Sequence, residues 1–318
     1  MSAAVASAAP AKVAARSLPG DLLRVADLTR KQLFEVLDLA ARMKADPKGW
    51  VTSHPGQTLA LIFEKPSTRT RVSFAAAAQR LGLLPVSLSP SELQLGRGET
   101  VADTARALSA YASAIVVRTF SQQLLIEMAE GASVPVINAL TDEHHPCQAL
   151  ADLMTIRERL GHLEGVRLAY VGDGDGNVVH SLMEAAALTG MDLAIACPAG
   201  YRPRAEIPPD AVWPGGQITV LDDHIAAVSG ADAVYTDVWV SMGEEQERTR
   251  RLARLRRFQV TPELMGRAKP GAFFLHCLPA HRGEEVAAEV IDGPASAVWQ
   301  QAANRLPTEQ ALLHLLIA

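Results

Sequence analysis

Short apolar runs recur along the chain, and stretches with helical character separate them. In the first half the apolar runs cover residues 59–63, 86–88, 114–117 and 134–137. In the second half they cover residues 167–171, 193–197, 218–221, 233–235 and 272–275. Alternation of short strands with helices is typical of parallel sheets covered by helices, so the pattern predicts an α/β fold.

The two series of strands are separated by residues 148–161, which carry an uninterrupted helical pattern, and residues 305–317 carry another. A chain of 318 residues with 48% apolar residues can fill two cores. We therefore expect two domains, each a parallel β-sheet flanked by helices, joined by interdomain helices. The expected boundaries are a flexible tail at 1–18, a first domain at 19–152, a second domain at 153–303 and a terminal helix at 304–318.

The charge of the chain argues against a general affinity for nucleic acid or anionic lipid, because the net charge is −5. One local exception is the arginine-rich stretch at 248–257, where acidic residues at 244, 245 and 247 stand beside the basic ones. This mixture favours a solvated helix over a nucleic-acid contact. The chain also has no apolar run of roughly 18–20 residues, the length that a membrane-spanning helix needs.

Cys147, Cys197 and Cys277 are odd in number, far apart and without a CxxC pair. This pattern indicates neither disulfides nor a structural zinc site, and it fits a reducing, cytoplasmic setting. Residues 1–16 are rich in alanine and carry Lys12 and Arg16 without an acidic residue. The composition weakly resembles an organellar transit peptide, but we favour a disordered tail because basic residues are few.

The first candidate site follows the apolar run 59–63 and comprises Ser67, Thr68, Arg69, Thr70 and Arg71. Pro66 and Ser67 favour the start of a helix, with Ser67 as the N-cap. A helix start offers unpaired N–H groups and a positive dipole end, and arginine can bind phosphate oxygens through two hydrogen bonds. The segment therefore predicts a phosphate site, although a capped surface helix with exposed arginines is the alternative.

The second candidate site is His145-Pro146-Cys147-Gln148, which follows the apolar run 134–137 and opens the helical stretch. Pro146 holds the turn, so we expect the imidazole of His145 and the amide of Gln148 to face the same space. A single histidine here would more often be structural. A histidine and a glutamine framing a proline favour the wall of a pocket.

Two later strands are followed by further polar residues. Asp237-Val-Trp-Val-Ser241-Met242-Gly243 follows the run 233–235, and its carboxylate, hydroxyl and backbone N–H suit the head group of an α-amino acid. Cys277 follows the run 272–275. Because His276 and Cys277 are adjacent, an extended chain would point them to opposite faces, which argues against a nucleophile–base pair. A plain buried thiol and a pocket-lining residue remain open for Cys277.

The turn Gly172-Asp-Gly174-Asp-Gly176-Asn177 follows a predicted strand and opens a helix, as dinucleotide-binding turns do. The dinucleotide fingerprint requires a glycine where Asn177 stands, and an acidic residue after the next strand, which instead ends at Cys197-Pro198. A nicotinamide-dependent dehydrogenase is therefore disfavoured. A non-catalytic binding or scaffold protein is a further alternative. It is disfavoured because such a protein would normally have lost some of these motifs, and here they are intact.

Taken together, these segments resemble the aspartate/ornithine carbamoyltransferase family from about residue 20 to the C-terminus. The motifs that carry the resemblance, in the order of the family, are Ser67–Thr70, Gln94–Thr100, Arg118-Thr119, His145–Gln148, Asp237–Gly243, His276–Ala280 and Asn304-Arg305. The resemblance implies transfer of the carbamoyl group of carbamoyl phosphate to an amine, by direct attack and a tetrahedral intermediate, without a metal or other cofactor. Ser-Met-Gly after Asp237 resembles the members that act on L-ornithine, which yields L-citrulline and phosphate in arginine metabolism; a relative acting on another amine is the alternative.

The resemblance also implies roles for individual residues. Carbamoyl phosphate would be bound by Ser67, Thr68, Arg69, Thr70, Gln94, Arg118, His145, Gln148, Cys277, Leu278 and Arg305. Ornithine would be bound by Asn177, Asp237, Ser241 and Met242, with residues 244–257 as a mobile flap, while Arg118, His145 and Cys277 would serve catalysis. Gln94 would reach into the neighbouring subunit's site, which implies a homotrimer or a multiple of trimers. The terminal helix would pack back on the first domain.

Three positions depart from the pattern of the family. The turn at 172–177 is one residue longer than usual, so the assignment of Asn177 depends on the alignment. Ala75 stands where the family often has glutamate. Pro307 stands where a histidine commonly follows the Asn304-Arg305 pair, which bears on the surroundings of Arg305.

Overall fold

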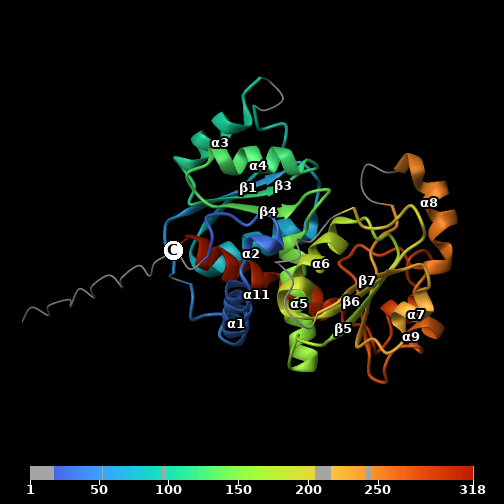
Figure 1. Ribbon diagram of the computed structural model, residues 1–318. Helices are drawn as coiled ribbons and strands as arrows, with labels where there is room; N and C mark the ends of the chain where they lie inside the picture. The colour runs from blue at the N-terminus through green and yellow to red at the C-terminus, as the bar shows by residue number, and fades with distance from the viewer. Residues whose placement is uncertain (1–17, 52, 95–97, 205–215, 241–244, 318) are drawn as a thin grey trace, which may run out of the picture.

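The strands of the first of two parallel sheets come from the N-terminal half of the chain. The computed structural model describes residues 18–51, 53–94, 98–204, 216–240 and 245–317 (Figure 1). The sheet has the strand order β2-β1-β3-β4, all parallel. Its strands are β1 (Thr58–Phe63), β2 (Leu84–Leu88), β3 (Ala114–Arg118) and β4 (Val136–Leu140). The accompanying helices are α1 (Arg30–Ala45), α2 (Thr68–Leu81), α3 (Val101–Ser109) and α4 (Gln122–Gly131), after a short 3-10 turn at Val25–Asp27.

The second sheet has the parallel strand order β7-β6-β5-β8-β9. Its strands are β5 (Arg167–Val171), β6 (Asp192–Ala196), β7 (Ile218–Leu221), β8 (Ala233–Tyr235) and β9 (Phe273–Leu275). Its helices are α6 (Asn177–Thr189), α7 (His224–Val228), α8 (Arg248–Leu255), α9 (Pro262–Met265) and α10 (Ala288–Ile291), with 3-10 turns at Glu245–Glu247 and Arg256–Phe258. The predicted α/β fold with two parallel sheets is confirmed.

Two strand boundaries differ from the prediction for reasons visible in the structure. β4 ends at Leu140 rather than at residue 137, and the buried Asn138 within it donates a hydrogen bond of 2.7 Å to the carbonyl of Leu23. A polar residue interrupts the apolar run, so the sequence pattern ended too early. β2 begins at Leu84 and includes Pro85, which is tolerated because β2 lies at the edge of its sheet.

Two long helices lie where the sheets meet (Figure 1). α5 (Pro146–Leu160) passes from the first sheet to the second, and α11 (Val298–Ile317) packs against α1, α2 and α5. α11 begins at Val298 rather than at residue 305 and continues through Pro307. Proline removes the N–H that would bond to the carbonyl of Ala303, but Ala303 is exposed, which leaves water as a partner for that carbonyl.

The largest hydrophobic cluster is continuous from one domain to the other. Leu33 of α1, Leu312 of α11, Met154 of α5 and Leu168 of β5 all belong to it. A separate cluster covers the far face of each sheet, around Ile115 in the first and Val234 in the second. Among the described residues, no helix is both long and apolar enough to cross a membrane.

Candidate active site

Three strands of the first sheet end beside one another and place the first group of polar residues. β3 lies between β1 and β4, and Arg118 is its last residue. α2 begins directly after β1 with Ser67 as its N-cap, whose hydroxyl accepts the N–H of Thr70 at 3.3 Å. α5 begins shortly after β4 with His145 as its N-cap. The positive ends of two helices therefore flank Arg118, as an anion site requires.

Arg118 is held as a buried cation. Only 7% of the residue is exposed, and its Nε atom has no hydrogen-bond partner within the described part of the chain. Burial and the neighbouring positive charge of Arg305 lower the pKa of Arg118 to about 10, so the guanidinium remains charged at neutral pH. A buried donor without an acceptor is costly. The register of β3 with β4 shifts between Val117 and Arg118, which re-aims this side chain at the end of the strand.

His145 lies beside the same cations as a neutral imidazole. Its N–H on the main chain donates to the hydroxyl of Ser181 at 2.7 Å, which ties the start of α5 to α6. Burial lowers the pKa of the His145 imidazole well below its ordinary value, and the charges of Arg305 and Arg118 act in the same direction. A neutral imidazole carries one N–H donor, and the Nδ1 atom has no partner.

Arg305 connects the terminal helix to this group. Its Nη1 atom donates to the Oε1 atom of Gln148 at 2.9 Å, and its Nη2 atom lies 3.5 Å from the hydroxyl of Thr70. Glu309, one helical turn later, accepts from Nε at 2.9 Å and from Nη2 at 2.6 Å. Burial is the largest effect and lowers the pKa of Arg305, but the charge and hydrogen bond of Glu309, together with Cys147 and Asp152, outweigh it, and the net shift is upward. Arg305 is therefore a fixed cation.

Glu309 also bears on the departure at Ala75. The carboxylate that a glutamate at position 75 would bring to α2 is absent, and Glu309 of α11 supplies a carboxylate beside Arg305. Glu309 is 1% exposed and interacts with the side chain of Ser73 on α2. Pro307 lies within α11 without ending it, so Arg305 and Glu309 remain four residues apart on one helix face.

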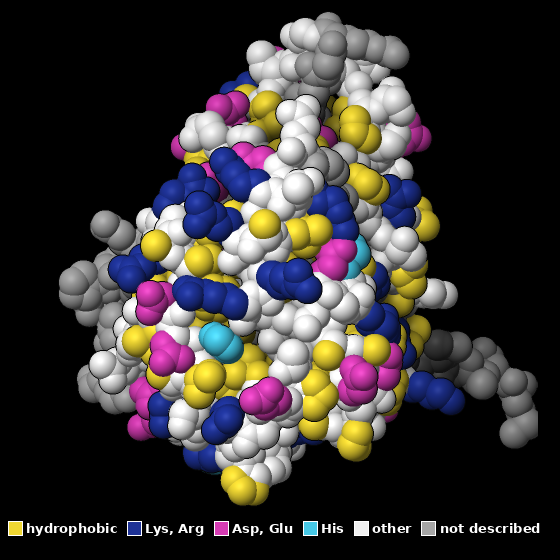
Figure 2. Space-filling view, turned by 90° about the vertical axis from the view of Figure 1, so that its right-hand side faces the viewer, with side chains coloured by type: hydrophobic (Ala, Val, Ile, Leu, Met, Phe, Trp, Pro, Cys, Tyr) yellow, Lys and Arg dark blue, Asp and Glu magenta, His cyan; other side chains and the backbone are white. Residues whose placement is uncertain are grey.

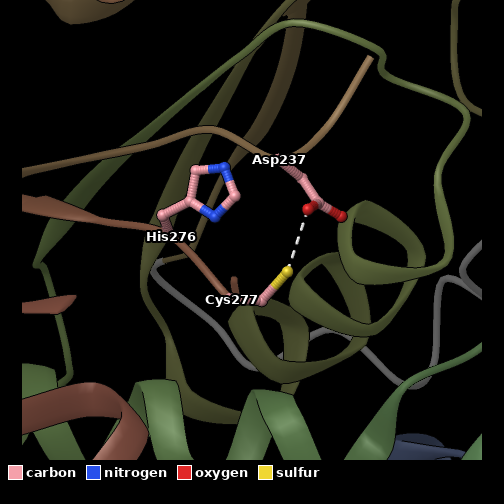
Figure 3. A group of neighbouring side chains, drawn as sticks. All are labelled: Asp237, His276 and Cys277. Atoms are coloured by element: carbon pink, nitrogen blue, oxygen red, sulfur yellow. Dashed lines mark hydrogen bonds between the residues drawn. The ribbon is translucent and has the colours of Figure 1, made fainter. Parts of the chain in front are cut away.

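The second group of polar residues lies at the carboxyl ends of β8 and β9. Figure 3 shows the sulfur of Cys277 pointing at the carboxylate of Asp237, to which it donates a hydrogen bond of 2.9 Å. Burial raises the pKa of the Cys277 thiol well above its usual range, and the charge of Asp237 raises it further. The thiol is therefore protonated, and Cys277 is poorly suited to act as a nucleophile.

His276 has both ring nitrogens engaged away from Cys277. Its Nδ1 atom accepts the N–H of Leu278 at 2.9 Å, so Nε2 carries the proton and faces the carboxylate of Glu285 at 3.3 Å. The side-chain ligand atoms of His276, Cys277 and Asp237 nevertheless lie within 4.8 Å of one another. Strand alternation predicted a wider separation for the two neighbours, but β9 ends at Leu275, so that alternation does not apply to them.

Two sets of described residues have donor types and spacing compatible with a metal ion. They are Asp237, His276 and Cys277, and a second set of His281, Glu284 and Glu285. In the first set the thiol is protonated and bonded to Asp237, while the imidazole is engaged on both sides. In the second set Glu284 is paired with Arg248 of α8. Cys277 and His276 in the first set and Glu284 in the second are thus already engaged within the protein.

Asn177 is the first residue of α6 and reaches across to the first domain. Its Nδ2 atom donates to the carbonyl of Thr141 at 2.6 Å, which leaves its Oδ1 atom for other donors. The preceding turn needs Gly174, because a Cβ atom there would lie 2.6 Å from the carbonyl oxygen of Tyr201 and 2.8 Å from the sulfur of Cys197. The glycine therefore serves close packing against the protein's own backbone.

The arginine-rich stretch forms α8 and is attached to the same turn. Arg251 is buried and forms an ion pair with Asp173, donates to the carbonyl of Trp239 at 2.6 Å and lies over the ring of Tyr201. A cavity of about 740 Å³ lies between α8 and the turn, lined in part by Arg204, Arg250 and Arg254. Arg248, Arg250 and Arg254 of α8 are exposed, which agrees with a solvated helix face, and Figure 2 shows both basic and acidic side chains spread over one face of the molecule.

The structure thus brings the predicted residues together in two groups. Thr70, Arg118, His145, Gln148 and Arg305 form the first group; Asp237 and Cys277 form the second, with Leu278 beside them. The charges of Arg69 and Arg118 act on the groups of the second domain, because Arg69 lowers the pKa of Cys277 and Cys277 acts on that of Arg118.

The remaining predicted residues are exposed or half-buried, or lie outside the described part of the chain. Ser67 is half-buried, whereas Thr68, Arg69 and Gln94 are exposed. Gln94 follows β2, and its carbonyl accepts the N–H of Glu99 at 3.3 Å. Ser241 and Met242 fall outside the described residues, as does the tail at 1–17.

The motifs did not reveal several buried polar residues of the site. Asp152, Gln301, Glu309 and Ser181 each contact a predicted residue, or its neighbour, through a hydrogen bond. A signal for some of them was present, since Gln148 and Asp152 are four residues apart, as are Gln301, Arg305 and Glu309 in succession. Such spacing places polar residues along one face of a helix.

Comparison with known families covers nearly the whole chain. Residues 20–158 match the family model "Aspartate/ornithine carbamoyltransferase, carbamoyl-P binding domain". Residues 164–316 match the model "Aspartate/ornithine carbamoyltransferase, Asp/Orn binding domain". The first match contains all the residues of the first group except Arg305, and the second match contains Arg305, Asp237 and Cys277.

Individual relatives and solved structures agree with these matches. The chain is 50% identical over 306 residues to the ornithine carbamoyltransferase of Symbiobacterium thermophilum, covering 94% of this chain and 98% of the relative. It is 53% identical over 302 residues to that of Methanothermobacter thermautotrophicus, covering 93% and 98%. The solved ornithine carbamoyltransferase of Pyrococcus furiosus superposes with a TM-score of 0.89 at 46% identity, covering 96% of this chain and 99% of that one.

Proposed function

The chain belongs to the aspartate/ornithine carbamoyltransferase family, and we propose that it transfers the carbamoyl group of carbamoyl phosphate to the side-chain amine of L-ornithine. The products are L-citrulline and phosphate, and the reaction belongs to arginine metabolism. The observation that carries the proposal is the pair of fixed cations, Arg118 and Arg305, beside a neutral His145 at the starts of two helices.

Carbamoyl phosphate is a phosphate anion joined to a carbonyl and an amide, and the first group offers a partner for each part. The start of α2, with Ser67, Thr68, Arg69 and Thr70, binds the phosphate through main-chain N–H groups and hydroxyls. Arg305 adds its positive charge. Gln148 presents its Oε1 atom, one lone pair of which accepts from Arg305, so the other is available to the carbamoyl NH₂.

Arg118, His145 and Thr70 are the donors to the carbamoyl oxygen. When the amine attacks the carbamoyl carbon, that oxygen gains negative charge, and donors already fixed around it stabilise the tetrahedral intermediate. Arg118 suits this role because its buried Nε lacks a partner, and His145 suits it because a neutral imidazole keeps a donor without adding to the local positive charge.

The second group receives ornithine. Asp237 accepts from its α-ammonium group, and Asn177 contributes its Oδ1 atom; we assign Ser241 and a main-chain N–H near Met242 to the same head group. Cys277 and Leu278 lie beside the reacting amine, with Cys277 as a protonated thiol that contacts Asp237. The segment around α8 closes over the bound amino acid and excludes water.

The chemical step is direct. Neutral Nδ of ornithine attacks the carbamoyl carbon, the new C–N bond forms, the bond to the phosphate oxygen breaks, and the amine proton passes to the departing phosphate. An alkyl ammonium has an ordinary pKa of about 10.4, so binding must select the neutral amine. Positioning and preorganised charge supply the catalysis.

We assign residues 19–152 with 304–318 to carbamoyl phosphate and residues 153–303 to ornithine, and we expect a homotrimer in the cytoplasm. Exposed apolar residues of the first domain support an assembly through that domain, since Val72, Leu84 and Tyr111 are each more than half exposed. Gln94 would then contribute to the neighbouring site. Light scattering after gel filtration tests the trimer, and a monomer at micromolar concentration would contradict it.

An acceptor panel tests the function. Purified protein receives carbamoyl phosphate with L-ornithine, putrescine, N-acetylornithine or aspartate, and the carbamoylated product is measured. We expect turnover with ornithine only. Turnover with another amine would keep the carbamoyl half of the site and overturn the assignment of Asp237 and its loop, whereas no turnover with any acceptor would overturn the proposed function.

A further inference from the structure

Asp152 occupies the junction of the two domains. It lies on α5 one turn after Gln148 and is completely buried. Its Oδ1 atom accepts two hydrogen bonds from side-chain amides, one from Nε2 of Gln148 at 2.8 Å and one from Nε2 of Gln301 on α11 at 2.7 Å. A carboxylate can only accept, so both amides must turn their NH₂ groups toward it.

Because the NH₂ group of each amide faces Asp152, the Oε1 atom of each glutamine faces the opposite way. The Oε1 atom of Gln148 faces away from Asp152 and accepts from Nη1 of Arg305 at 2.9 Å. The Oε1 atom of Gln301 accepts the main-chain N–H of His276 at 2.9 Å. One continuous chain of hydrogen bonds therefore runs from Arg305, through Gln148, Asp152 and Gln301, to His276.

Each end of this chain belongs to one half of the proposed site. Arg305 and Gln148 are assigned to carbamoyl phosphate. His276 precedes Cys277 and accepts the N–H of Leu278 at 2.9 Å, so its position sets the backbone that follows β9. Glu285, also buried, accepts from His276 on its far side and so fixes the ring.

We infer that Asp152 is a positioning residue that orients the amides of Gln148 and Gln301 and thereby couples the carbamoyl phosphate half of the site to the half that binds the amine. The inference rests on the proposed function. It adds a residue that touches neither substrate. Loss of the negative charge would weaken both hydrogen bonds to Oδ1, because bonds to a charged acceptor are about twice as strong as bonds to a neutral one. Either amide could then turn more easily and present NH₂ rather than oxygen to Arg305 or to the N–H of His276.

The buried surroundings of Asp152 bring the pKa of its carboxyl group close to neutral pH. Burial raises the pKa of Asp152 to about 7, although hydrogen bonds from Gln301, Gln148 and Tyr235 and the charge of Arg305 oppose this. The charged or titratable groups that face it are Arg305 on α11, Tyr235 on β8 and Cys277 after β9. The Oδ2 atom has no hydrogen-bond partner and is the natural position for the proton.

The effects of pH on stability and on orientation have opposite signs. Because folding raises the pKa, the stability contributed by Asp152 is present at low pH and is lost as the pH rises from the ordinary carboxyl range through about 7. The carboxylate, by contrast, holds both amides more firmly than the neutral acid does, and it prevails above about pH 7.

The test compares the full-length wild-type protein with Asp152→Asn, which keeps the shape and removes the charge. We expect kcat/KM for carbamoyl phosphate to fall roughly 10- to 100-fold above neutral pH, the usual effect of losing a hydrogen bond to a charged group. Deprotonation of ornithine makes kcat/KM rise with pH in both proteins. An inflection near pH 7 should be added to this rise in the wild type and be absent from the variant, while the melting temperature at alkaline pH stays the same or increases.

Thr155→Val is the matched control. Thr155 lies on the same face of α5 and accepts from Nδ2 of Asn304 on α11 at 2.9 Å, without contact to either half of the site. We expect it to lower the melting temperature and to leave the pH profile unchanged. Gln301→Leu breaks the arm toward His276, together with the bond of 3.1 Å from Gln301 to the hydroxyl of Tyr235, and leaves the bond between Asp152 and Gln148 in place. It should therefore raise KM for ornithine far more than KM for carbamoyl phosphate.

The outcomes separate this inference from the proposed function. If the wild type forms citrulline and Asp152→Asn keeps the wild-type pH profile, the inference is wrong. If the wild type forms no citrulline, the proposed function fails. Calorimetric titration with carbamoyl phosphate one pH unit above and below 7 then decides the inference, which requires tighter binding at the higher pH in the wild type only. If Asp152→Asn does not fold, Gln301→Leu provides the test of the inference. Equal changes in KM for ornithine and KM for carbamoyl phosphate would then contradict the proposed role of the arm toward His276.

Discussion

The guanidinium of Arg305 donates a hydrogen bond of 2.9 Å to the amide oxygen of Gln148, which joins the terminal helix α11 to the interdomain helix α5. Both residues are buried, and they lie beside Thr70 at the start of α2. The first group of polar residues is therefore held together by two helices at the junction of the domains, and the position of α11 determines where Arg305 lies.

Removal of Glu309 should destabilise the fold. In Glu309→Ala the guanidinium of Arg305 would remain buried without its carboxylate, and breaking a buried ion pair by removing one partner costs about 3–5 kcal/mol. The free energy of unfolding from chemical denaturation measures this. Glu130→Ala, at an exposed position on α4, should change it by less than about 0.5 kcal/mol. Equal midpoints for the two variants would contradict the role of Glu309.

Loss of Arg118 should affect the transition state. Arg118→Ala removes a fixed donor to the carbamoyl oxygen, and removal of one such donor typically lowers kcat by about 10²–10³-fold. Steady-state citrulline formation provides the measurement. Arg106→Ala is the control, because Arg106 is exposed on α3 and pairs only with Asp103 of its own helix. An unchanged kcat/KM in Arg118→Ala would exclude Arg118 from the chemical step.

His145 should act as a neutral group at every pH at which the protein is active. Burial and the charges of Arg305 and Arg118 lower its pKa, so protonation belongs to pH values well below the ordinary imidazole value of 6.5. Protonation of His145 should therefore cause no loss of activity as the pH is lowered through 6.5. The pH–activity profiles of the wild type and His145→Gln should have the same shape on the acidic side. An inflection near 6.5 in the wild type that is lost in His145→Gln would contradict this.

Cys277 should react slowly with thiol reagents. Burial and Asp237 raise the pKa of the thiol, which leaves little thiolate at neutral pH. We expect slow alkylation by iodoacetamide below about pH 9, and we expect Cys277→Ser to keep turnover with a higher KM for ornithine. Rapid modification near pH 7, or complete loss of turnover in Cys277→Ser, would instead indicate a nucleophilic cysteine.

The sequence predicted the parts of the site that local chemistry determines. Ser67 and His145 were expected at helix starts, and both are N-caps. These predictions succeeded because a helix start is signalled by capping residues and prolines that are close to it in the sequence. The strands followed from apolar runs for the same reason. Asn138 and Pro85 interrupt the pattern at two of the larger boundary differences, in β4 and β2, while several other strands differ from the prediction by one residue at an end.

The residues that the sequence did not reveal depend on distant segments. The buried contacts of Asp152 depend on Gln301, which lies 149 positions later in the chain. Those of Glu309 depend on the packing of α11 against α2 and α5. A single polar residue in a helix is usually on the surface, so a motif search passes over it. The four-residue spacing of polar residues along two otherwise apolar helices was the available signal.

Transfer of a carbamoyl group from carbamoyl phosphate to ornithine is the central claim, and its stoichiometry tests it most directly. Citrulline and phosphate should be measured together over time with purified protein, carbamoyl phosphate and L-ornithine. We predict that the two products appear in a one-to-one ratio and that neither forms above the rate of spontaneous decay when ornithine is omitted. Enzyme-dependent release of phosphate without an equal amount of citrulline would contradict direct transfer.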